Sequence, residues 1–244
     1  MQATNEQLIE TNPHEKPSAE RTVIRPRSER QLLPVEAIEY YLFRPLASHD
    51  RLLDGAYELW RDGWQATLRE LEGSTRLHSD EFARQDEIGA LVVGRRCIAV
   101  TGLRWLDLSL ARAREDSYFQ HWPAAALDRV GQRMVGISSN TVLHPDWRGT
   151  VIEAPSGSSS QTMRLAITTV ELSVRRLLAS TASAAIGMAR NDRSMNQVAS
   201  SLGGTRLAQI RLHGEETDLI TVERSDVRVY SPVIDELWQR RHQG

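Results

Sequence analysis

Hydroxyl side chains stand inside one apolar stretch of the chain, VGISSNTVLHPDWRGT, from Val135 to Thr150. The stretch reads as a β-strand, and alternation along a strand would place Ser139 and Thr141 on the same face. Two hydroxyls on one face can hold a water molecule that relays a proton. Such a relay must end at an ionisable side chain that accepts the proton. Each side chain considered for this role could instead be an ordinary solvated surface group. The candidates are Asp86, Glu87, Asp107 and His144, of which Asp107 is taken with Ser139 and Thr141 as the predicted catalytic set.

The same strand ends in a charged turn, Pro-Asp-Trp-Arg-Gly. Pro145 has no N–H to donate, so it ends the pairing of the strand. The loop TVIEAPSGSSSQ then delays the next helix. Two plain alternatives stay open: Trp147 and Arg148 form a surface turn in which the tryptophan covers the core edge, and the Gly/Ser loop is a flexible linker.

The strand must be held by its neighbours, and the pattern of the chain predicts which elements these are. Residues 1–34 are polar and without lasting periodicity, so they predict a flexible leader before a single domain at 35–244. Two apolar runs separated by Gly-Arg-Arg predict a hairpin over 87–109, and SYFQHWPAAALDRV predicts a short helix. The remaining predicted elements are a strand at 38–46, a helix at 49–71, a helix at 161–181 with Ser159 or Ser160 as its N-cap, a strand at 183–189, a helix at 194–204, strands at 206–213 and 217–230, and a helix at 231–242.

Composition limits the classes of function. A net charge of −2 and a pI near 6.4 give no basic field for nucleic acid or an anionic membrane. The single cysteine, Cys97, permits no disulfide within the chain, and no segment reaches the ~18 apolar residues of a membrane helix, so a cytoplasmic protein is expected. Neither a zinc-type spacing nor the G-x-x-x-x-G-K-[ST] loop of nucleotide hydrolases is present, and no metal is expected.

The order of predicted elements is similar to that of the GNAT acyltransferases, and VLHPDWRG resembles their Val-x-Pro-x-x-Arg-Gly signature. The resemblance covers residues 38 to 230 and implies an α+β, three-layer fold with a mixed, mainly antiparallel sheet and a splayed central strand pair. Within the superfamily, the front half resembles the branch of N-acyl amino acid synthases and acyl-homoserine-lactone synthases. The segments that carry this are GAYELWRDGWQATL, SDEFARQDE, WLDLS and SYFQHWPAAALDRVGQRMVGISSN.

The resemblance implies a donor site built largely from backbone. The splayed strand would offer free peptide groups to the donor's pantetheine, here those of Thr141, Val142 and Leu143. Arg148 and Gly149 would begin a phosphate loop beside the next helix. This chain departs from the family's Arg-Gly-x-Gly-x-Gly/Ala continuation, and the residues that could rebuild an anion-binding nest are Gly157, Ser158, Ser159 and Ser160.

Other family positions match less completely. Where many members carry a glutamate base this sequence has Ile137, and the tyrosine acid of the family has no clear counterpart. Asn191 or Asn196 corresponds to the asparagine that begins the following helix, and we assign Asn196 to donor binding. The aromatic residues Tyr118, Phe119 and Trp122 would close over an acyl chain or an acceptor, or else pack their short helix on the sheet.

The resemblance therefore implies an N-acyltransferase that moves an acyl group, including fatty acyl, to a primary amine of an amino acid or of a peptide such as a natural-product precursor. Its co-substrate would be acyl-CoA or an acyl thioester on acyl carrier protein (acyl-ACP), which makes the carrier protein a partner; a homodimer is left open. Two alternatives stand beside this expectation. One is an acyl-homoserine-lactone-like synthase that uses S-adenosylmethionine, and the other is a catalytically silent GNAT-like binding module.

Overall fold

The computed structural model describes residues 31–46, 50–77, 81–156, 162–228 and 231–243. The helices are α1 (Arg51–Glu72), α2 (Ala111–Arg114), α3 (Ala124–Val130), α4 (Leu165–Leu178), α5 (Met195–Ser201) and α6 (Pro232–Gln239). The strands are β1 (Leu32–Pro34), β2 (Ile38–Phe43), β3 (Glu87–Val93), β4 (Arg96–Asp107), β5 (Met134–Leu143), β6 (Val151–Glu153), β7 (Thr162–Arg164), β8 (Ala184–Arg190), β9 (Thr205–Leu212), β10 (Glu215–Glu223) and β11 (His242–Gln243).

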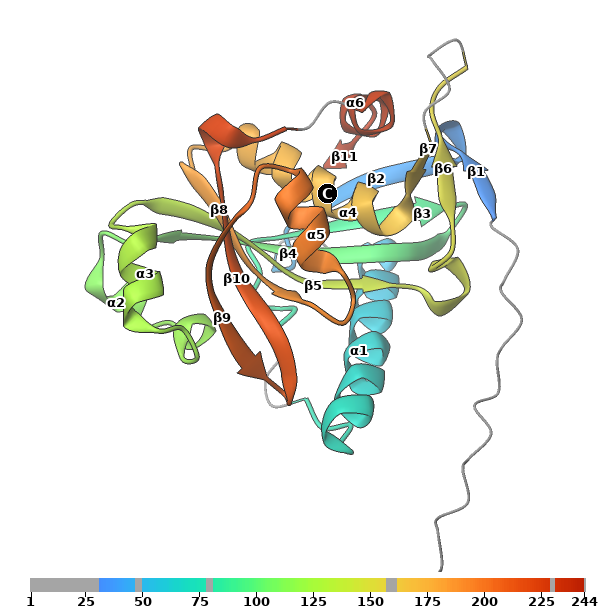
Figure 1. Ribbon diagram of the computed structural model, residues 1–244. Helices are drawn as coiled ribbons and strands as arrows, with labels where there is room; N and C mark the ends of the chain where they lie inside the picture. Colours follow the sequence, from blue (N-terminus) through green and yellow to red (C-terminus); the bar gives the residue numbers. More distant parts are fainter. Residues whose placement is uncertain (1–30, 47–49, 78–80, 157–161, 229–230, 244) are drawn as a thin grey trace, which may run out of the picture.

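One mixed sheet organises the described residues, with the strand order β11-β2-β3-β4-β5-β8-β10-β9 (Figure 1). Adjacent strands are antiparallel except for two pairs, β5 with β8 and β11 with β2. The predicted α+β class, with a mainly antiparallel sheet and a parallel pair at its centre, is confirmed.

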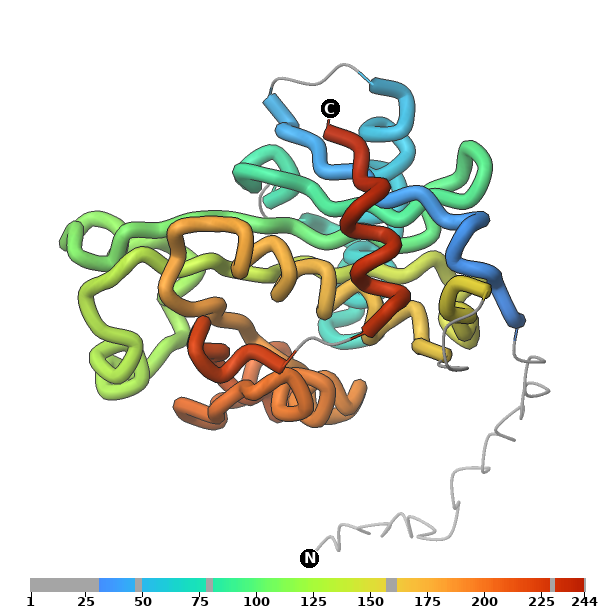
Figure 2. The backbone as a smooth tube through the Cα atoms, turned by 90° about the horizontal axis from the view of Figure 1, so that it is seen from above, coloured from blue at the N-terminus to red at the C-terminus, as the bar shows by residue number. Residues whose placement is uncertain are grey.

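Helices cover both faces of this sheet. On one face, here called the α1 face, α1 packs on β2–β5 and α3 packs on β5, β8 and β9. The opposite face, here called the α4 face, carries α4, α5 and α6. In the view from above, α6 lies across the middle of the molecule (Figure 2). None of the described helices is long and apolar enough to cross a membrane.

Helix α1 forms where the sequence predicts it, because both ends carry stop signals and one face is apolar. The Asp50 side chain accepts a hydrogen bond from the Leu52 N–H at 2.8 Å and so caps the first turn. Gly73, at φ 66°, ends the helix in the left-handed region that glycine tolerates. The apolar positions Leu53, Ala56, Leu59 and Trp60 are buried, and Leu52 beside them is partly buried.

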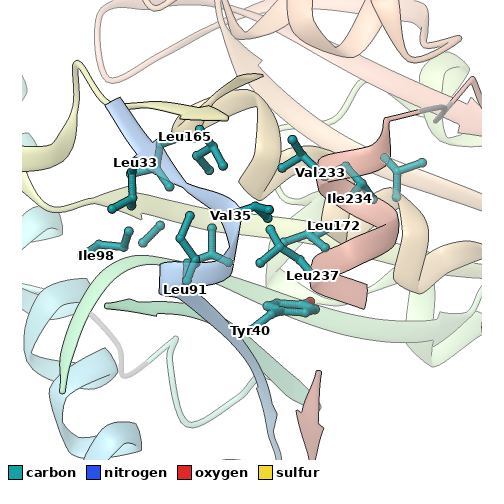
Figure 3. Packing of buried hydrophobic residues seen from close by; sticks show 14 of the residues in the cluster. Leu33, Val35, Tyr40, Leu91, Ile98, Leu165, Leu172, Val233, Ile234 and Leu237 are labelled. Atoms are coloured by element: carbon teal, nitrogen blue, oxygen red, sulfur yellow. The ribbon is translucent and has the colours of Figure 1, made fainter. Parts of the chain in front are cut away.

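The largest core cluster lies on the α4 face, between the sheet and the helices α4 and α6. Leu172 of α4 lies beside Leu237 of α6 in this cluster, which also contains Leu165 of α4 and Val233 and Ile234 of α6 (Figure 3). Leu33 and Val35, from the beginning of the described chain, are buried in the same cluster. The stretch predicted as leader therefore includes a packed segment, β1, while residues 1–30 lie outside the described residues.

The segment after Arg148 differs from its prediction. In place of a loop leading straight to a helix, β6 and β7 form an antiparallel hairpin, and β1 pairs with β6 in parallel. Helix α4 begins at Leu165, later than predicted, because Thr162–Arg164 is used by β7. Its N-cap is Arg164, with no side-chain cap, so the prediction of Ser159 or Ser160 as N-cap is wrong. Gly157, Ser158, Ser159 and Ser160 themselves lie outside the described residues.

Glu171 on α4 should make stability depend on pH. One carboxylate oxygen is buried without a hydrogen-bond partner among the described residues, and burial raises the pKa of Glu171 from 4.5 to about 7. Between these values the folded state binds the extra proton, so stability falls as pH rises from about 4.5 to 7 and stays lower above it. We expect Glu171→Gln to be more stable than the wild type at pH 8 by about 1–2 kcal/mol, after allowance for partial exposure. Urea unfolding at pH 5 and pH 8 measures this, and an equal wild-type stability at both pH values would contradict it.

Candidate active site

The two central strands separate after a short parallel pairing. β5 pairs with β8 over three residues only, Val135–Ile137 with Ala184–Ile186. The carbonyl of Ser138 still lies near Gly187, where a Cβ would be 3.5 Å from it. The register between the strands ends after Ile137 and Ile186, so Ser138 and Gly187 mark the apex of an opening, here called the splay. Its limbs are the later parts of β5 and β8.

A β-bulge sits in β5 just beyond the apex. Ser139 pairs with Gly102 and Val142 pairs with Val100, so two β5 residues, Asn140 and Thr141, oppose Thr101 alone. Asn140 adopts φ 57°, in the left-handed region. The extra residue changes the alternation of side chains beyond it. The prediction that Ser139 and Thr141 share a face is therefore wrong.

Side-chain contacts place the two hydroxyls on opposite faces. Ser139 Oγ donates to Gln85 Oε1 at 3.4 Å on the α1 face. Thr141 Oγ1 lies 3.0 Å from Thr101 Oγ1, which faces the α4 side, as its approach to Gly89 and Tyr40 shows. The structure brings neither hydroxyl to the other, so a single water relay between them is not supported.

The bulge also decides which peptide groups face the splay. The His144 N–H donates to the Ile98 carbonyl of β4 at 2.9 Å. Two residues earlier, Val142 pairs with Val100 and points the same way. The peptide groups of Thr141 and Leu143 therefore point away from β4, toward the side that β8 has left. The sequence analysis predicts unpaired peptide groups at Thr141, Val142 and Leu143. The prediction is wrong for Val142, whose peptide groups face β4.

A polar group missed by the sequence analysis lies on the α1 face beside Ser139. Gln85 is buried, and its Nε2 donates to the Glu81 carbonyl at 2.6 Å. The Gln85 side chain fits there because Gly102 has no side chain; a Cβ at Gly102 would lie 2.6 Å from Gln85 Oε1. A glycine inside the apolar strand RCIAVTGLRWLD was the available signal, because such a glycine often marks a close approach.

A buried ion pair borders the same area. Arg104, which follows Gly102 on the same face of β4, donates to both carboxylate oxygens of Asp116 at 2.6 and 3.3 Å. Arg84 reaches Asp116 at 3.5 Å from the solvent side. The Arg104 hydrogen bonds lower the pKa of Asp116 although burial opposes them, so the carboxylate stays ionised. This cluster gives the α1 side of the splay fixed polar groups of both charges.

The predicted proton acceptors lie elsewhere. Asp107 binds the Ser109 N–H and hydroxyl at 3.0 and 2.6 Å, which lowers its pKa. It pairs with Met134, five residues before Ser139 and thus about 16 Å away along the strand. Asp86 accepts the Trp105 N–H at 2.7 Å, and Glu87 holds Arg176 at 2.7 and 2.8 Å. Asp107 is therefore not brought together with Ser139 and Thr141.

His144 is also engaged outside the splay. Its Nδ1 accepts the Asp146 N–H at 3.3 Å, and its Nε2 lies 2.8 Å from Arg96. Partial burial, together with the Arg96 charge, lowers its pKa. Among the described residues, no carboxylate or imidazole is hydrogen-bonded to Ser139 or Thr141.

The start of α4 lies beside the 145–149 turn that follows β5. The Leu165 N–H, the first of α4, donates to the Thr150 carbonyl at 3.1 Å. Arg148 and Arg164 flank this point, are exposed, and have no ion-pair partner among the described residues. Trp147 packs against the large core cluster, so the reading in which this tryptophan covers the core edge is correct.

The side chains of Asn191 and Asn196 converge on one buried carboxylate of β10. Both side-chain amides donate to Asp218 of β10 at 3.3 Å, as does Gln209 of β9. Asp218 is only 4% exposed. These contacts hold the beginning of α5 against β10, and the assignment of Asn196 to donor binding stays a prediction.

Tyr118, Phe119 and Trp122 pack together and against the sheet. Phe119 and Trp122 meet edge to face at 5.4 Å, and both are buried with Ile137 and Ile186. The packing alternative is therefore what the structure shows. The same contacts put these rings under the apex of the splay, and their role in substrate binding stays a prediction.

One open cleft among the described residues has no residue of the splay in its lining. Its volume is about 660 Å³, and it is lined by Arg44, Asp86, Glu87, Trp105, Arg176 and the end of α4. Its Glu87 and Arg176 are already paired with each other. The parallel pairing of β5 with β8 ends at Ile137, which leaves later peptide groups of β5 without a partner on β8, so we place the candidate active site at the splay. No group of three or more metal-ligating side chains is found among the described residues.

Comparisons with known proteins identify structures of similar fold. No family model and no curated protein matches the sequence. Among solved structures, the chain is similar to the CoA-dependent acyl-homoserine lactone synthase BjaI with SAM and isopentyl-CoA, at 14% identity and a TM-score of 0.52, over 85% of this chain and 93% of that one. It is also similar to FeeM, an N-acyl amino acid synthase from uncultured soil microbes, at 11% identity and a TM-score of 0.52, over 78% and 92%. The GNAT fold expected from the sequence is confirmed.

Proposed function

We propose that the protein transfers an acyl group from a thioester donor to a primary amine. The observation that carries this is the splay, in which the peptide groups of Thr141 and Leu143 face the side that β8 leaves. A pantetheine arm is a chain of amides, and it can pair with such an edge as a strand would. A thioester carbonyl held there meets fixed N–H donors as negative charge develops on its oxygen.

The donor's phosphate would lie at the start of α4. Free N–H groups of the first turn and the exposed guanidinium groups of Arg148 and Arg164 suit an anion. Acyl-CoA and acyl-ACP both carry a phosphate on the pantetheine, so both are proposed donors. The similarity to BjaI, whose structure contains isopentyl-CoA, supports a donor of this class.

The amine would approach from the α1 face, where Ser139, Gln85 and the Arg104–Asp116 pair lie. Its nitrogen attacks the thioester carbon, a C–N bond forms, and the C–S bond breaks. The nitrogen loses a proton and the departing thiolate takes one up. Since no acid–base side chain of the described residues is hydrogen-bonded to Ser139, we propose that water at Ser139 Oγ carries the proton, and that a thiolate needs no strong acid to leave.

The test is turnover with a panel of donors and acceptors. Purified protein is given acyl-CoA or acyl-ACP of several lengths with mixed amino acids, amine-bearing peptides and S-adenosylmethionine. Thiol release with a new acyl-amide mass supports the proposal, and an acyl-homoserine lactone mass would favour the synthase alternative. No thiol release with any donor would favour the silent binding module, which the absence of a contacting base also permits.

Arg148→Ala should weaken binding of phosphate-bearing donors. We expect the KM for acyl-CoA to rise about tenfold with little change in kcat, because a charge-assisted contact to phosphate is lost in both ground and transition states. Acyl-pantetheine without phosphate should be unaffected. Arg95→Ala, which removes another exposed arginine in the β3–β4 turn, is the matched control. An equal loss with the phosphate-free donor would contradict the assignment.

A further inference from the structure

The C-terminal end of α1 reaches across the splay and contacts the segment after β8 and the turn between β9 and β10, here together called the far limb. The middle of α1 rests on the near limb, where Gly63 meets Val142 of β5. Its last turn extends further, and Figure 1 shows this end beside the tips of β9 and β10. Two glutamates in that turn, Glu70 and Glu72, face residues of the far limb.

Two ion pairs join α1 to the far limb. Arg193, in the segment between β8 and α5, donates from Nη2 to both carboxylate oxygens of Glu70 at 3.0 Å. His213, in the turn between β9 and β10, pairs through Nδ1 with Glu72. Arg193 Nε also forms an ion pair with Asp192 Oδ2 at 3.3 Å, and Asp192 forms a second ion pair with Arg190. The partners in the two pairs are 123 and 141 residues apart in sequence, so these contacts report the closed arrangement of the fold.

The backbone at His213 has the conformation that the hairpin turn requires. His213 and Gly214 have φ of 52° and 83°, as a two-residue hairpin turn of type I′ requires. Asparagine or aspartate is the preferred residue at the first position of such a turn. Histidine is also among the residues enriched in this left-handed region. Its longer side chain is what allows the turn to reach Glu72.

We propose that Glu70, Glu72, Arg193 and His213 form a latch that closes α1 over the amine side of the splay and opens to admit the acceptor and release the amide. The proposal rests on the proposed function for the identity of what passes. Exposed ion pairs are weak, so two of them shift the closed-to-open ratio by only about twofold to thirtyfold. A latch of this strength favours closure during transfer and still opens readily.

A reversible cross-link tests the latch. Glu72→Cys with His213→Cys is joined by a bis-maleimide that contains a disulfide; the one native cysteine, Cys97, is buried. We expect cross-linking to lower acceptor-dependent thiol release at least tenfold and to leave the thermal shift by CoA unchanged, and reductant to restore turnover. Each single-cysteine variant treated alike is the control. A cross-linked enzyme that turns over at the uncross-linked rate would overturn the latch.

Hydrogen exchange tests the latch without relying on turnover. His213→Asn keeps a residue suited to positive φ and removes the imidazole, so the fold should be as stable as the wild type or more so. We expect amides near Leu68–Glu72 to exchange several-fold faster in this variant. Unchanged exchange there would overturn the latch even in an active enzyme. A wild type inactive with every donor would instead count against the proposed function, whatever the exchange result.

Discussion

Replacing Gly63 with alanine is expected to slow acyl transfer by about 100-fold while the protein stays folded. The new Cβ would lie 2.2 Å from Cγ1 of Val142 and 3.3 Å from its Cβ and Cγ2. Valine cannot escape this overlap by rotation alone, because a β-branched side chain leaves few rotamers. Either α1 or the bulged part of β5 must move. Thr141 and Leu143 flank Val142, so the peptide groups proposed to hold the donor move with it.

A double variant separates this effect from general damage to α1. Val142→Ala removes both methyl groups that the new Cβ would meet, so Gly63→Ala with Val142→Ala should regain most of the lost kcat/KM. None of these substitutions alters the chemistry of the β5 peptide groups, so the change in kcat/KM reports the position of those groups. Gly55→Ala, on the same helix where a Cβ meets nothing within 4 Å, is the matched control. If the double variant were as slow as Gly63→Ala, the position of β5 would not be the cause.

Arg224→Ala is expected to destabilise the fold by about 3 kcal/mol. The guanidinium donates to four carbonyls that surround the end of α4: those of Leu177, Leu178, Ser180 and Ala182, at 2.5 to 3.0 Å. Without it, the carbonyls of Leu178, Ser180 and Ala182 lose this donor, while that of Leu177 keeps the Ser180 N–H and hydroxyl. The positive charge that favours a helix C-terminus is lost as well.

Equilibrium unfolding in urea measures this loss, as a lower midpoint at unchanged slope. Arg224→Lys is the informative control, because lysine keeps the positive charge but its single ammonium group cannot donate to all four carbonyls as the planar guanidinium does. It should recover less than half of the stability. A midpoint for Arg224→Ala within error of the wild type would show that solvent or a neighbouring group satisfies these carbonyls equally well.

Long elements were predictable because their pattern repeats over many residues. Helix α1 has an apolar face, an Asp50 cap and a Gly73 stop, all visible in the sequence. The β3–β4 hairpin and the central strand β5 followed from apolar runs bounded by turn residues. The hairpin of β6 and β7 was missed because strands of three residues are too short to show alternation.

The site was less predictable, because single backbone conformations and distant contacts shape it. The left-handed Asn140 reverses the face of every later residue of β5, and the sequence SSNTV carries no sign of it beyond an asparagine. Gln85 stands in the segment before β3, and only the folded sheet brings it under Ser139. Asp107 seemed available as an acid, but the register of β4 with β5 puts it at the opposite end of the strand from the splay.

Residue-resolved amide exchange with a donor analogue tests the central claim most directly. The analogue is an acyl-CoA whose thioester sulfur is replaced by a methylene group, so it binds without reacting. We expect the N–H groups of Thr141 and Leu143 to exchange rapidly in the free protein and at least tenfold more slowly in the complex, while that of Val142, paired with β4, is slow in both. Binding of the analogue without protection at Thr141 and Leu143 would contradict the donor site proposed at the splay.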